Sequence, residues 1–269
     1  MEEFQIRKSF LFGDTFARKV DGIPNFKDII QDLDSLLDSS TITKNDVYVK
    51  AGVFELSGSK YFIKRYSPRN IFYKIGYLFK QIRAEHSWFA SLLLDEHSIA
   101  NPKSYLVCSK RKFGFIRTSY LITEAVSDIF SISYFKETFG NSDKSETFYA
   151  KVIKQLASVH NAGIFHSDAK LWNFYAYKDT LGQEKIGIWD LDGAVIYKEL
   201  PIYKRVLDLS RTIASIIELN REVGFDVYNS TFIDRIASSY EKYSNCRLAL
   251  KQLESKVGWF LAKKKIYKT

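Results

Sequence analysis

The feature that most constrains this chain is a pair of short polar segments, each preceded by an apolar run. The first is H-S-D-A-K-L-W-N at residues 166–173, and the second is I-W-D-L-D-G at residues 188–193. Phosphoryl transfer needs a carboxylate that accepts a hydroxyl proton, a lysine that meets the moving phosphoryl group, and an amide with a second carboxylate to hold Mg²⁺. The two segments contain all of these groups. In the alternative interpretation, Asp168 and Asp190 are ordinary turn residues, because aspartate is common in turns.

The composition is that of a globular protein. The chain has 269 residues, of which 46% are hydrophobic and 26% are charged, so one large domain or two lobes can bury a substantial core. The two cysteines fit neither a disulfide framework nor a metal-binding spacing, which favours a reducing compartment. The first residues lack the pattern of a signal peptide, and no apolar run approaches the ~20 residues of a membrane span. We therefore expect a cytoplasmic protein.

The charge balance is strongly basic, with a formal net charge of +9 and a pI near 9.2. A basic surface favours anionic partners, which include nucleic acid, an anionic membrane surface and an anionic substrate. Nucleic-acid binding would explain the charge but not the acidic residues of the two polar segments. We therefore expect an anionic substrate or membrane surface and no nucleic acid.

Residue periodicity predicts the order of helices and strands. Helices are predicted over residues 25–37, 71–99, 127–139, 145–161, 231–243 and 247–260, and a further helix is predicted to begin near Pro201. Strands are predicted over residues 47–49, 53–56, 61–66, 104–109, 114–126 and 174–177, and a last strand is predicted to end at Asp190. Turns are predicted at residues 57–59 and 110–112. The two polar segments would then lie at adjacent ends of a hairpin and face one cleft.

A lysine lies within the strand-like segment Y-F-I-K-R-Y at residues 61–66. Lys64 has apolar and aromatic neighbours, and a strand lysine that faces a cleft is well placed to hold nucleotide phosphates. Glu85, on the helix that follows, is placed to pair with Lys64. In the alternative interpretation both are exposed surface residues, as most lysines are.

Two further positions are candidates for supporting roles. Thr123 and Glu124 are polar residues at the end of an apolar strand, which suits a hinge whose backbone groups meet an adenine edge. Asp208 and Arg211 lie on the helix that begins near Pro201 and are candidates to brace the 166–173 segment.

Two segments mix aromatic and basic residues. Residues 71–83 read I-F-Y-K-I-G-Y-L-F-K-Q-I-R, and residues 258–269 read G-W-F-L-A-K-K-K-I-Y-K-T. Both patterns suit contact with anionic lipid head groups. The first pattern equally suits a core helix with solvated lysines, and the second equally suits a solvated tail, so both alternatives stay open.

Taken together, these segments resemble the protein-kinase-like superfamily, and within it the lipopolysaccharide core kinases, the Kdo/heptose kinase family. The resemblance covers roughly residues 48–219. It is carried by Y-F-I-K-R-Y, by R-A-E at 83–85, by L-A-S-V-H-N-A-G-I-F-H-S-D-A-K-L-W-N-F at 156–174, by I-W-D-L-D-G-A at 188–194 and by R-V-L-D-L-S-R at 205–211. The H-x-D-x-K-x-x-N pattern is shared by the whole superfamily, and the surrounding sequence favours the lipopolysaccharide branch.

The resemblance implies ATP and Mg²⁺ as cofactors and a role for each matching residue. For the nucleotide, Lys64 looks like the lysine that holds ATP phosphates, Glu85 like its helix partner, and Glu124 and Val126 like the hinge. For the chemistry, Asp168 looks like the catalytic base, Lys170 like the lysine that meets the γ-phosphate, and Asn173 and Asp190 like the Mg²⁺ ligands. His166 would brace the loop.

The implied fold is an α+β, two-lobed protein-kinase-like fold. We expect one such domain over residues 1–269, with a β-rich N-lobe at about 1–125 and a mainly helical C-lobe at about 126–269. The implied acceptor is a hydroxyl of heptose or Kdo in the lipopolysaccharide inner core, reached by a monomer at the cytoplasmic face of the inner membrane. The alternatives are an atypical serine/threonine protein kinase, a small-molecule kinase, and an inactive pseudokinase that serves as a binding module.

Two departures from the superfamily pattern affect these expectations. No G-x-G-x-x-G loop is found, and only Lys50-Ala51-Gly52 is expected between the first two strands. The path from Asp190 to Asp208 is short and contains no A-P-E token. Protein kinases dock peptides on the longer segment found there, so its absence favours a small or glycolipid acceptor.

Overall fold

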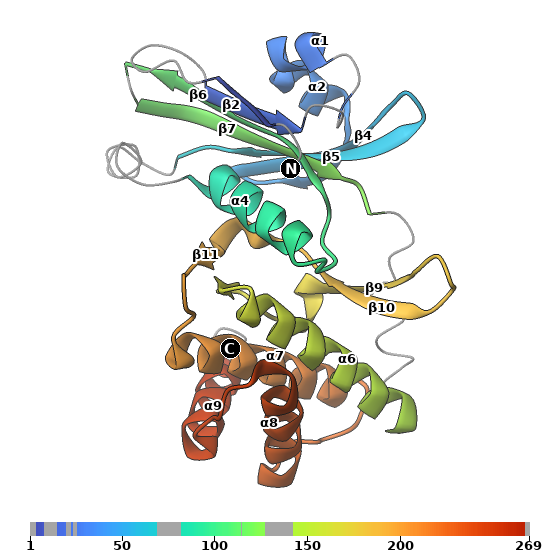
Figure 1. Ribbon diagram of the computed structural model, residues 1–269, viewed down its shortest axis with the longest axis vertical. Coiled ribbons are helices and arrows are strands. Elements are labelled where there is room, and N and C mark those ends of the chain that lie inside the picture. Colours follow the sequence, from blue (N-terminus) through green and yellow to red (C-terminus); the bar gives the residue numbers. More distant parts are fainter. Residues whose placement is uncertain are drawn as a thin grey trace. The chain divides into compact units, whose positions relative to one another are not determined.

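The structure is a computed structural model that describes residues 4–7, 15–19, 23, 26–68, 82–113, 115–126 and 142–266. The chain divides into two compact units, drawn in Figure 1. Unit 1 comprises residues 1–92 and 102–127, and unit 2 comprises residues 93–101 and 128–269. The expected helix over 127–139, and the first part of the expected helix over 71–99, lie outside the described residues.

Unit 1 is built on a seven-stranded antiparallel sheet with the order β1-β2-β6-β7-β5-β4-β3. Its strands are β1 (Phe4–Arg7), β2 (Thr15–Lys19), β3 (Thr41–Asn45), β4 (Val49–Leu56), β5 (Ser59–Tyr66), β6 (Ser104–Lys112) and β7 (Phe115–Glu124). The predicted strands correspond to β4 through β7, except that the two strands predicted at 47–49 and 53–56 are one strand, β4, whereas β1, β2 and β3 were not predicted. Strand β3 is an edge strand whose five residues are all exposed, so it lacks the apolar alternation that marks a strand.

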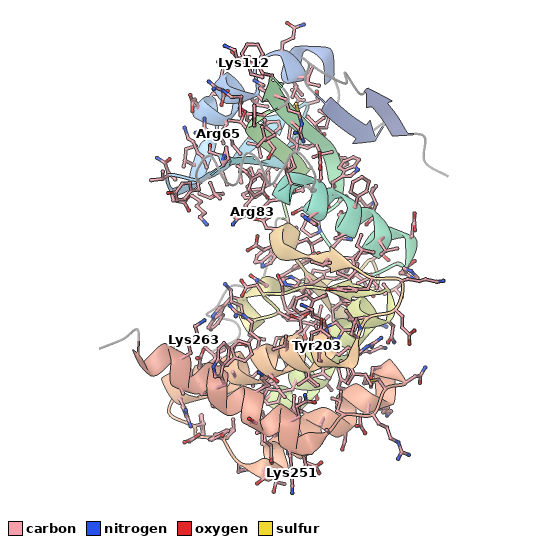
Figure 2. The ribbon with its side chains drawn as sticks, turned by 90° about the vertical axis from the view of Figure 1, so that its left-hand side faces the viewer. Arg65, Arg83, Lys112, Tyr203, Lys251 and Lys263 are labelled. Carbon is pink, nitrogen blue, oxygen red and sulfur yellow. The ribbon has the colours of Figure 1, made fainter. Side chains whose placement is uncertain are left out.

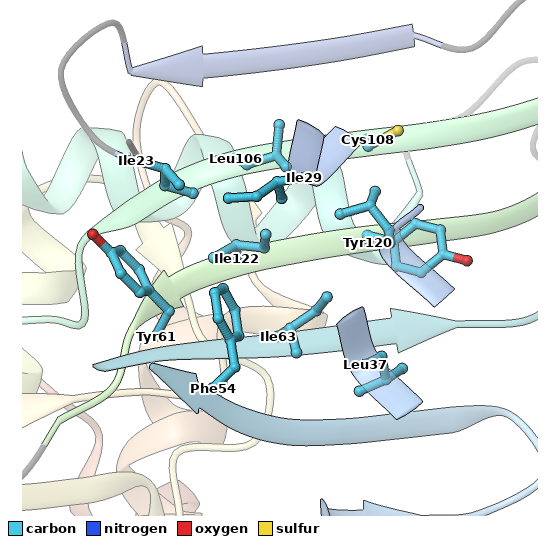
Figure 3. Close-up of a cluster of buried hydrophobic side chains, with 11 residues drawn as sticks. Ile23, Ile29, Leu37, Phe54, Tyr61, Ile63, Leu106, Cys108, Tyr120 and Ile122 are labelled. Atoms are coloured by element: carbon cyan, nitrogen blue, oxygen red, sulfur yellow. The ribbon is translucent and has the colours of Figure 1, made fainter. Parts of the chain in front are cut away.

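Helices cover the two faces of this sheet, because β4 through β7 bury apolar side chains on both sides. Helices α1 (Phe26–Gln31) and α2 (Leu33–Ser39) cover one face, where buried side chains form the cluster shown in Figure 3. On β5, Tyr61 and Ile63 point into this cluster. Helix α4 (Arg83–Glu96) packs on the opposite face through Ala84 and Trp88, together with Tyr66 of β5. Since side chains alternate along a strand, Lys64 lies on the α4 face.

The expected single helix over 25–37 is instead two helices, so this prediction is wrong. Helix α1 ends at Gln31, and Asp32 is the N-cap of α2, because its side chain accepts a hydrogen bond of 2.9 Å from the backbone N–H of Ser35. Aspartate is a strong N-cap residue. A local side chain to backbone bond therefore interrupts a continuous apolar periodicity.

Two turns of the sheet were predicted from sequence, with different outcomes. The turn between β4 and β5 is confirmed, and Ser57 and Gly58 both have positive φ angles, 51° and 78°, as the turns favoured in tight hairpins require. The turn predicted at 110–112 is wrong, because these residues continue β6, and the chain turns at Phe113, with a φ of 53°.

Unit 2 is mainly helical, and the hairpin strands and the helices predicted within its described residues are confirmed. Its helices are α6 (Ser142–Asn161), α7 (Ile202–Glu222), α8 (Ser230–Ser244) and α9 (Leu250–Ile266), with short 3₁₀ turns η1 (Leu171–Asn173) and η2 (Leu191–Gly193). Its strands are β8 (Ile164–Phe165), β9 (Phe174–Lys178), β10 (Glu184–Ile188) and β11 (Val195–Ile196). Helix α7 packs against α6 and α9, and α8 packs against α6 (Figure 1).

One glycine sets the path of the chain from α6 into β8. Gly163 has a φ of +80°, and a Cβ placed on it would lie 2.3 Å from the carbonyl oxygen of Tyr197. We expect Gly163→Ala to lower the free energy of unfolding by about 3 kcal/mol, because a left-handed alanine costs about 1–2 kcal/mol and overpacking costs about 1–3 kcal/mol. Urea denaturation measures this loss.

Gly182 provides a matched control for this substitution. Its φ is +74°, but nothing lies within 4 Å of an added Cβ, so Gly182→Ala tests the backbone conformation without the steric clash. We expect a loss of only about 1–2 kcal/mol for this variant. Equal losses for the two variants would show that the close approach to Tyr197 contributes nothing.

Candidate active site

The segments at 166–173 and 188–193 lie together in unit 2, at adjacent ends of the β9–β10 hairpin as expected. Ile188 pairs with Phe174, and the backbone N–H of Trp189 donates to the carbonyl oxygen of Asn173 at 3.0 Å. The indole N–H of Trp189 donates to the carbonyl oxygen of Trp172 at 2.8 Å. These bonds hold Asp190, the next residue, beside the end of the first segment.

His166 connects the same two segments from the other side, which is the bracing role expected of it. The side chain is fully buried, and its Nε2 lies 2.9 Å from the carbonyl oxygen of Trp189. Its Nδ1 lies 3.3 Å from the backbone nitrogen of Asp168. A carbonyl can only accept and a backbone N–H can only donate, so Nε2 carries the proton of a neutral ring and Nδ1 accepts. One imidazole thus fixes the backbone at Asp168 and just before Asp190.

Side chains on one face of α7 hold the first segment through hydrogen bonds. The carboxylate of Asp208 accepts the backbone N–H of His166 at 2.7 Å, and the hydroxyl of Ser215 accepts the backbone N–H of Leu171 at 2.7 Å. The hydroxyl of Thr212 donates to the carbonyl oxygen of Ala169. Asp208, Thr212 and Ser215 are spaced four and three residues apart, which places them on one side of a helix. The expected bracing by Asp208 is therefore confirmed, and the two hydroxyl residues were missed because serine and threonine are common in helices.

Asp168 lies at the centre of a cluster of polar side chains. Lys170 Nζ lies 2.9 Å from Asp168 Oδ2, and the guanidinium of Arg211 forms an ion pair with Oδ1. The amide nitrogen of Asn173 donates to the carbonyl oxygen of Asp168 at 2.7 Å and to Oδ2 at 3.3 Å. The structure thus brings together Asp168, Lys170 and Asn173, three of the residues selected from the sequence.

The orientation of Asn173 is relevant to metal binding. Both contacts of its amide nitrogen are with oxygen atoms of Asp168, so the amide is oriented by its surroundings and its oxygen points away from that residue. An amide oxygen and a nearby carboxylate are ligands that Mg²⁺ accepts, since it is usually bound by one or two protein carboxylates with substrate phosphates and water. Within the described residues, no group of three or more His, Cys, Asp or Glu is placed to hold a metal ion. The donor set of Asn173 and Asp190 fits Mg²⁺ completed by phosphate oxygens.

The backbone is strained at one residue in each segment. Ser167 has a φ of 68° and Asp190 has a φ of 56°, and both lie in the left-handed region that costs non-glycine residues energy. The two segments also pack closely, because a Cβ on Gly193 would lie 2.3 Å from Ser167 Oγ. Such strain is typical of functional sites, where the surrounding structure holds an unfavourable conformation.

A buried chain of hydrogen bonds extends behind Asp208. His160 is completely buried, with Nε2 at 3.2 Å from Asp208 Oδ2 and Nδ1 at 2.7 Å from the hydroxyl of Tyr240. Arg205 donates to the same hydroxyl at 3.3 Å. Burial lowers the pKa of His160 below its usual 6.5, and the hydrogen bond to Asp208 acts in the opposite direction. A neutral ring then donates from Nε2 to Asp208 and accepts from Tyr240, whose pKa burial raises to about 12.

This histidine predicts a dependence of stability on pH. Below about pH 6.5 the unfolded chain binds a proton at residue 160 that the folded chain excludes, so the free energy of unfolding falls as the pH falls, by up to about 1.4 kcal/mol per pH unit. We expect His160→Gln to remove this contribution. Urea denaturation of both proteins between pH 7.5 and pH 5 measures the difference in slope. Parallel curves would contradict the exclusion of the proton.

Lys64 and Glu85 lie in unit 1. Both belong to the face of the sheet that α4 covers, and the Lys64 ammonium lies 5.4 Å from the ring centroid of Tyr66. Glu85 accepts from the backbone N–H of Ile82 at 3.2 Å and from the hydroxyl of Ser109 at 3.4 Å. The pairing of Glu85 with Lys64, and the facing of Lys64 toward Asp168, stay predictions.

The expected hinge lies at the end of β7. The backbone N–H of Glu124 donates to the carbonyl oxygen of Lys103 at 2.8 Å, and the N–H of Ala125 donates to the carbonyl oxygen of Lys60 at 3.2 Å. The hydroxyl of Thr123 donates to the carbonyl oxygen of Glu124 at 3.1 Å, which leaves that oxygen a second lone pair. A nucleotide contact at the hinge would therefore use the carbonyl of Glu124 and the N–H of Val126.

The region expected to cover the phosphates differs from the prediction. Lys50-Ala51-Gly52 does not connect two strands, because β4 runs without a break from Val49 to Leu56 and these residues pair with β3. The actual turn before β4 is closed by Asp46, whose carboxylate accepts the backbone N–H groups of Tyr48 at 2.9 Å and Val49 at 2.7 Å. These hydrogen bonds lower the pKa of Asp46. Two amides that a glycine-rich loop would offer to phosphates are thus bound to a side chain.

Comparison with known proteins relates the chain to one family and to solved structures. The family model described as "Lipopolysaccharide kinase (Kdo/WaaP) family" matches residues 27–218. A solved structure titled "WaaP in complex with acyl carrier protein" is similar with a TM-score of 0.60 and 16% sequence identity, over 91% of this chain and 96% of that chain. At this identity the likeness shows the fold, and the expected α+β class is confirmed. No curated protein sequence matches.

Proposed function

Since the chain belongs to the lipopolysaccharide kinase (Kdo/WaaP) family, and is therefore a kinase that uses ATP, we propose that it phosphorylates a hydroxyl of heptose or Kdo in the lipopolysaccharide inner core. The observation that carries this proposal is the environment of Asp168. Its carboxylate lies in the loop with the H-x-D-x-K-x-x-N pattern, 2.9 Å from Lys170 Nζ and beside the Asn173 amide. A carboxylate so placed can orient and deprotonate a hydroxyl next to a bound phosphoryl group.

Each residue selected from the sequence has a role in the proposed reaction. In unit 2, Asp168 accepts the hydroxyl proton, Lys170 contacts the γ-phosphate, and Asn173 and Asp190 hold Mg²⁺. In unit 1, Lys64 with Glu85 holds the ATP phosphates, and Glu124 and Val126 bind the adenine. When bound, Mg²⁺ neutralises phosphate charge. Positioning and charge compensation then supply most of the catalysis.

The proposed acceptor is an anionic glycolipid, and the surface of unit 2 supports contact with anionic lipid. On α9, Trp259 is 50% exposed, and the ammonium groups of Lys256 and Lys263 lie 5.8 Å and 5.1 Å from its ring centroid. Lys251 and Lys263 are exposed near the two ends of this helix (Figure 2). Among the described residues, no helix is long and apolar enough to span a membrane. We propose that the protein acts at the cytoplasmic face of the inner membrane as a peripheral monomer, which the exposed Trp259 and its neighbouring lysines support.

An acceptor screen tests the proposal. Purified protein is incubated with Mg²⁺ and γ-labelled ATP, and with either inner-core lipopolysaccharide or a casein-like peptide mixture. We expect label in the core oligosaccharide, located on heptose or Kdo by mass spectrometry of the released sugars. Preferential labelling of peptides would support the protein-kinase alternative instead. Absence of label in every acceptor, together with no binding of ATP, would support the pseudokinase alternative.

A further inference from the structure

Two cations contact the carboxylate of Asp168, one at each oxygen. Lys170, which contacts the γ-phosphate in the proposed reaction, approaches Oδ2, and Arg211 forms an ion pair with Oδ1. Both cationic side chains are 36% exposed, and that of Asp168 is 32% exposed, so the cluster is reachable from solvent. Lys170, Arg211 and Asp168 together carry one net positive charge.

The pair between Arg211 and Asp168 is incomplete as a hydrogen-bonded contact. Arg211 Nε is buried and has no hydrogen-bond partner within the described part of the chain, and Asp168 Oδ1 is met only by Nη2 of the guanidinium, without the geometry of a hydrogen bond. Another arginine on the same helix shows the contrast. Arg221 binds Asp226 with two hydrogen bonds, from Nε at 3.1 Å and from Nη2 at 3.3 Å. Since buried polar atoms are nearly always hydrogen-bonded, the unsatisfied atoms at Arg211 call for an explanation.

The position of Arg211 is instead supported by packing. The centre of its guanidinium lies 5.5 Å from the ring centroid of Phe260 on α9, within the range of a cation–π contact. An aromatic contact holds the plane of a guanidinium but uses none of its N–H donors. Arg211 therefore lies beside Asp168, and its N–H groups can donate hydrogen bonds to an anionic group.

We propose that Arg211 determines acceptor specificity, by exchanging Asp168 Oδ1 for a phosphate or carboxylate group of the acceptor when that acceptor binds. This inference rests on the proposed function. A guanidinium matches the two oxygens of either anion with parallel hydrogen bonds, which its single contact with Asp168 does not achieve. The exchange frees Oδ1 of Asp168 from its ion pair. Asp168 can then act as the base only when an anionic acceptor has bound to Arg211.

The reaction step that follows is balanced. The acceptor hydroxyl gives its proton to Asp168 Oδ1, and its oxygen forms a bond to the γ-phosphorus of ATP. The bond from that phosphorus to the β–γ bridging oxygen breaks, and ADP leaves. Without an anionic acceptor, Arg211 stays paired with Oδ1. Asp168 then cannot readily take a proton from water, so hydrolysis of ATP is slow.

The test compares Arg211→Gln and Arg211→Lys with Arg221→Gln, which removes a charge from the same helix outside the cluster. Three acceptors are used, namely inner-core lipopolysaccharide, the same material after dephosphorylation, and the same material with its carboxylates reduced to alcohols. For each, kcat/KM is measured with γ-labelled ATP, and ATP hydrolysis without acceptor is measured separately. Urea denaturation checks that each variant is folded.

We expect Arg211→Gln to lower kcat/KM for the intact acceptor by about 10- to 100-fold, the usual effect of losing a charge-assisted hydrogen bond. For whichever modified acceptor lacks the recognised anion, wild type and Arg211→Gln are expected to be equally slow, which identifies the anion as phosphate or carboxylate. Hydrolysis of ATP without acceptor is expected to rise several-fold in Arg211→Gln. Arg211→Lys should recover only part of the loss, and Arg221→Gln should match wild type throughout.

Two results would overturn the inference. If Arg211→Gln lowers transfer to all three acceptors and ATP hydrolysis by one common factor, Arg211 only positions Asp168. If Arg211→Gln leaves every rate unchanged, Arg211 has no role in the reaction. If wild type phosphorylates none of the glycolipids, the proposed function fails, and the hydrolysis measurement still decides whether Arg211 restrains Asp168.

Discussion

Replacing Asp168 by asparagine is expected to lower kcat for phosphoryl transfer by about a thousandfold, since a positioned general base contributes about 10²- to 10⁴-fold. Asparagine has nearly the same shape as aspartate, but its amide cannot accept the hydroxyl proton. It also leaves the two cations at Lys170 and Arg211 without a compensating carboxylate. Transfer of labelled phosphate from ATP to inner-core lipopolysaccharide, under saturating substrate, measures the effect.

The control for this prediction is a second aspartate that is paired with an arginine of the same helix. Asp226 binds Arg221 near the end of α7 and is largely exposed, so Asp226→Asn removes an Asp–Arg pair without touching the loop. We expect its kcat to match wild type. Near wild-type turnover in Asp168→Asn would show that Asp168 is not the base. Urea denaturation checks that Asp168→Asn is as stable as wild type, so that a loss of its activity can be assigned to the missing base.

Replacing Asp208 by alanine is expected to have the largest effect on stability, a loss of about 3–5 kcal/mol in the free energy of unfolding, because it leaves two buried donors unsatisfied at about 1–3 kcal/mol each. The carboxylate is 1% exposed and accepts from the backbone N–H of His166 and from the ring of His160. Alanine leaves both buried donors without an acceptor. This loss is a large part of the 5–15 kcal/mol that typically stabilises a domain.

Asp208→Asn separates the two contributions to this effect. Both hydrogen bonds go to Oδ2, so the amide oxygen of asparagine can still accept from His166 and from His160, but the negative charge is lost. We therefore expect a smaller loss of stability for asparagine than for alanine, measured as the shift in urea midpoint. Equal and small losses in both variants would contradict the role of Asp208 as the buried acceptor that holds the loop.

Much of the fold could be predicted because it depends on local patterns. Apolar periodicity located β4 through β7, the β9–β10 hairpin and the helices α6, α7, α8 and α9. Prediction failed where a single side chain ended a helix within a continuous apolar periodicity, and where a strand at the sheet edge had no such periodicity. Asp32 divides the first helix by capping the second, and β3 carries no apolar alternation because all its residues are exposed.

The candidate site was predicted to the extent that it is local. Asp168, Lys170 and Asn173 come together because they belong to one loop of a few residues, whose pattern was visible in the sequence. The contacts of Arg211 were only partly foreseen, since bracing of the loop was expected and an ion pair with Asp168 itself was not. The polar face formed by Thr212 and Ser215 was missed, because nothing in a helix distinguishes a hydroxyl that binds a distant loop from one that binds its own backbone.

The sequence by itself determined the chemical groups of this protein and the loop that carries them, because residues close in the chain stay close in any fold. Tertiary structure alone decided which distant groups those residues meet. His166 and Asp208, and Asp168 and Arg211, lie more than forty residues apart and become partners only when α7 packs beneath the loop. The neutral state of His160 likewise follows from complete burial, which depends on how α6, α7 and α8 pack together.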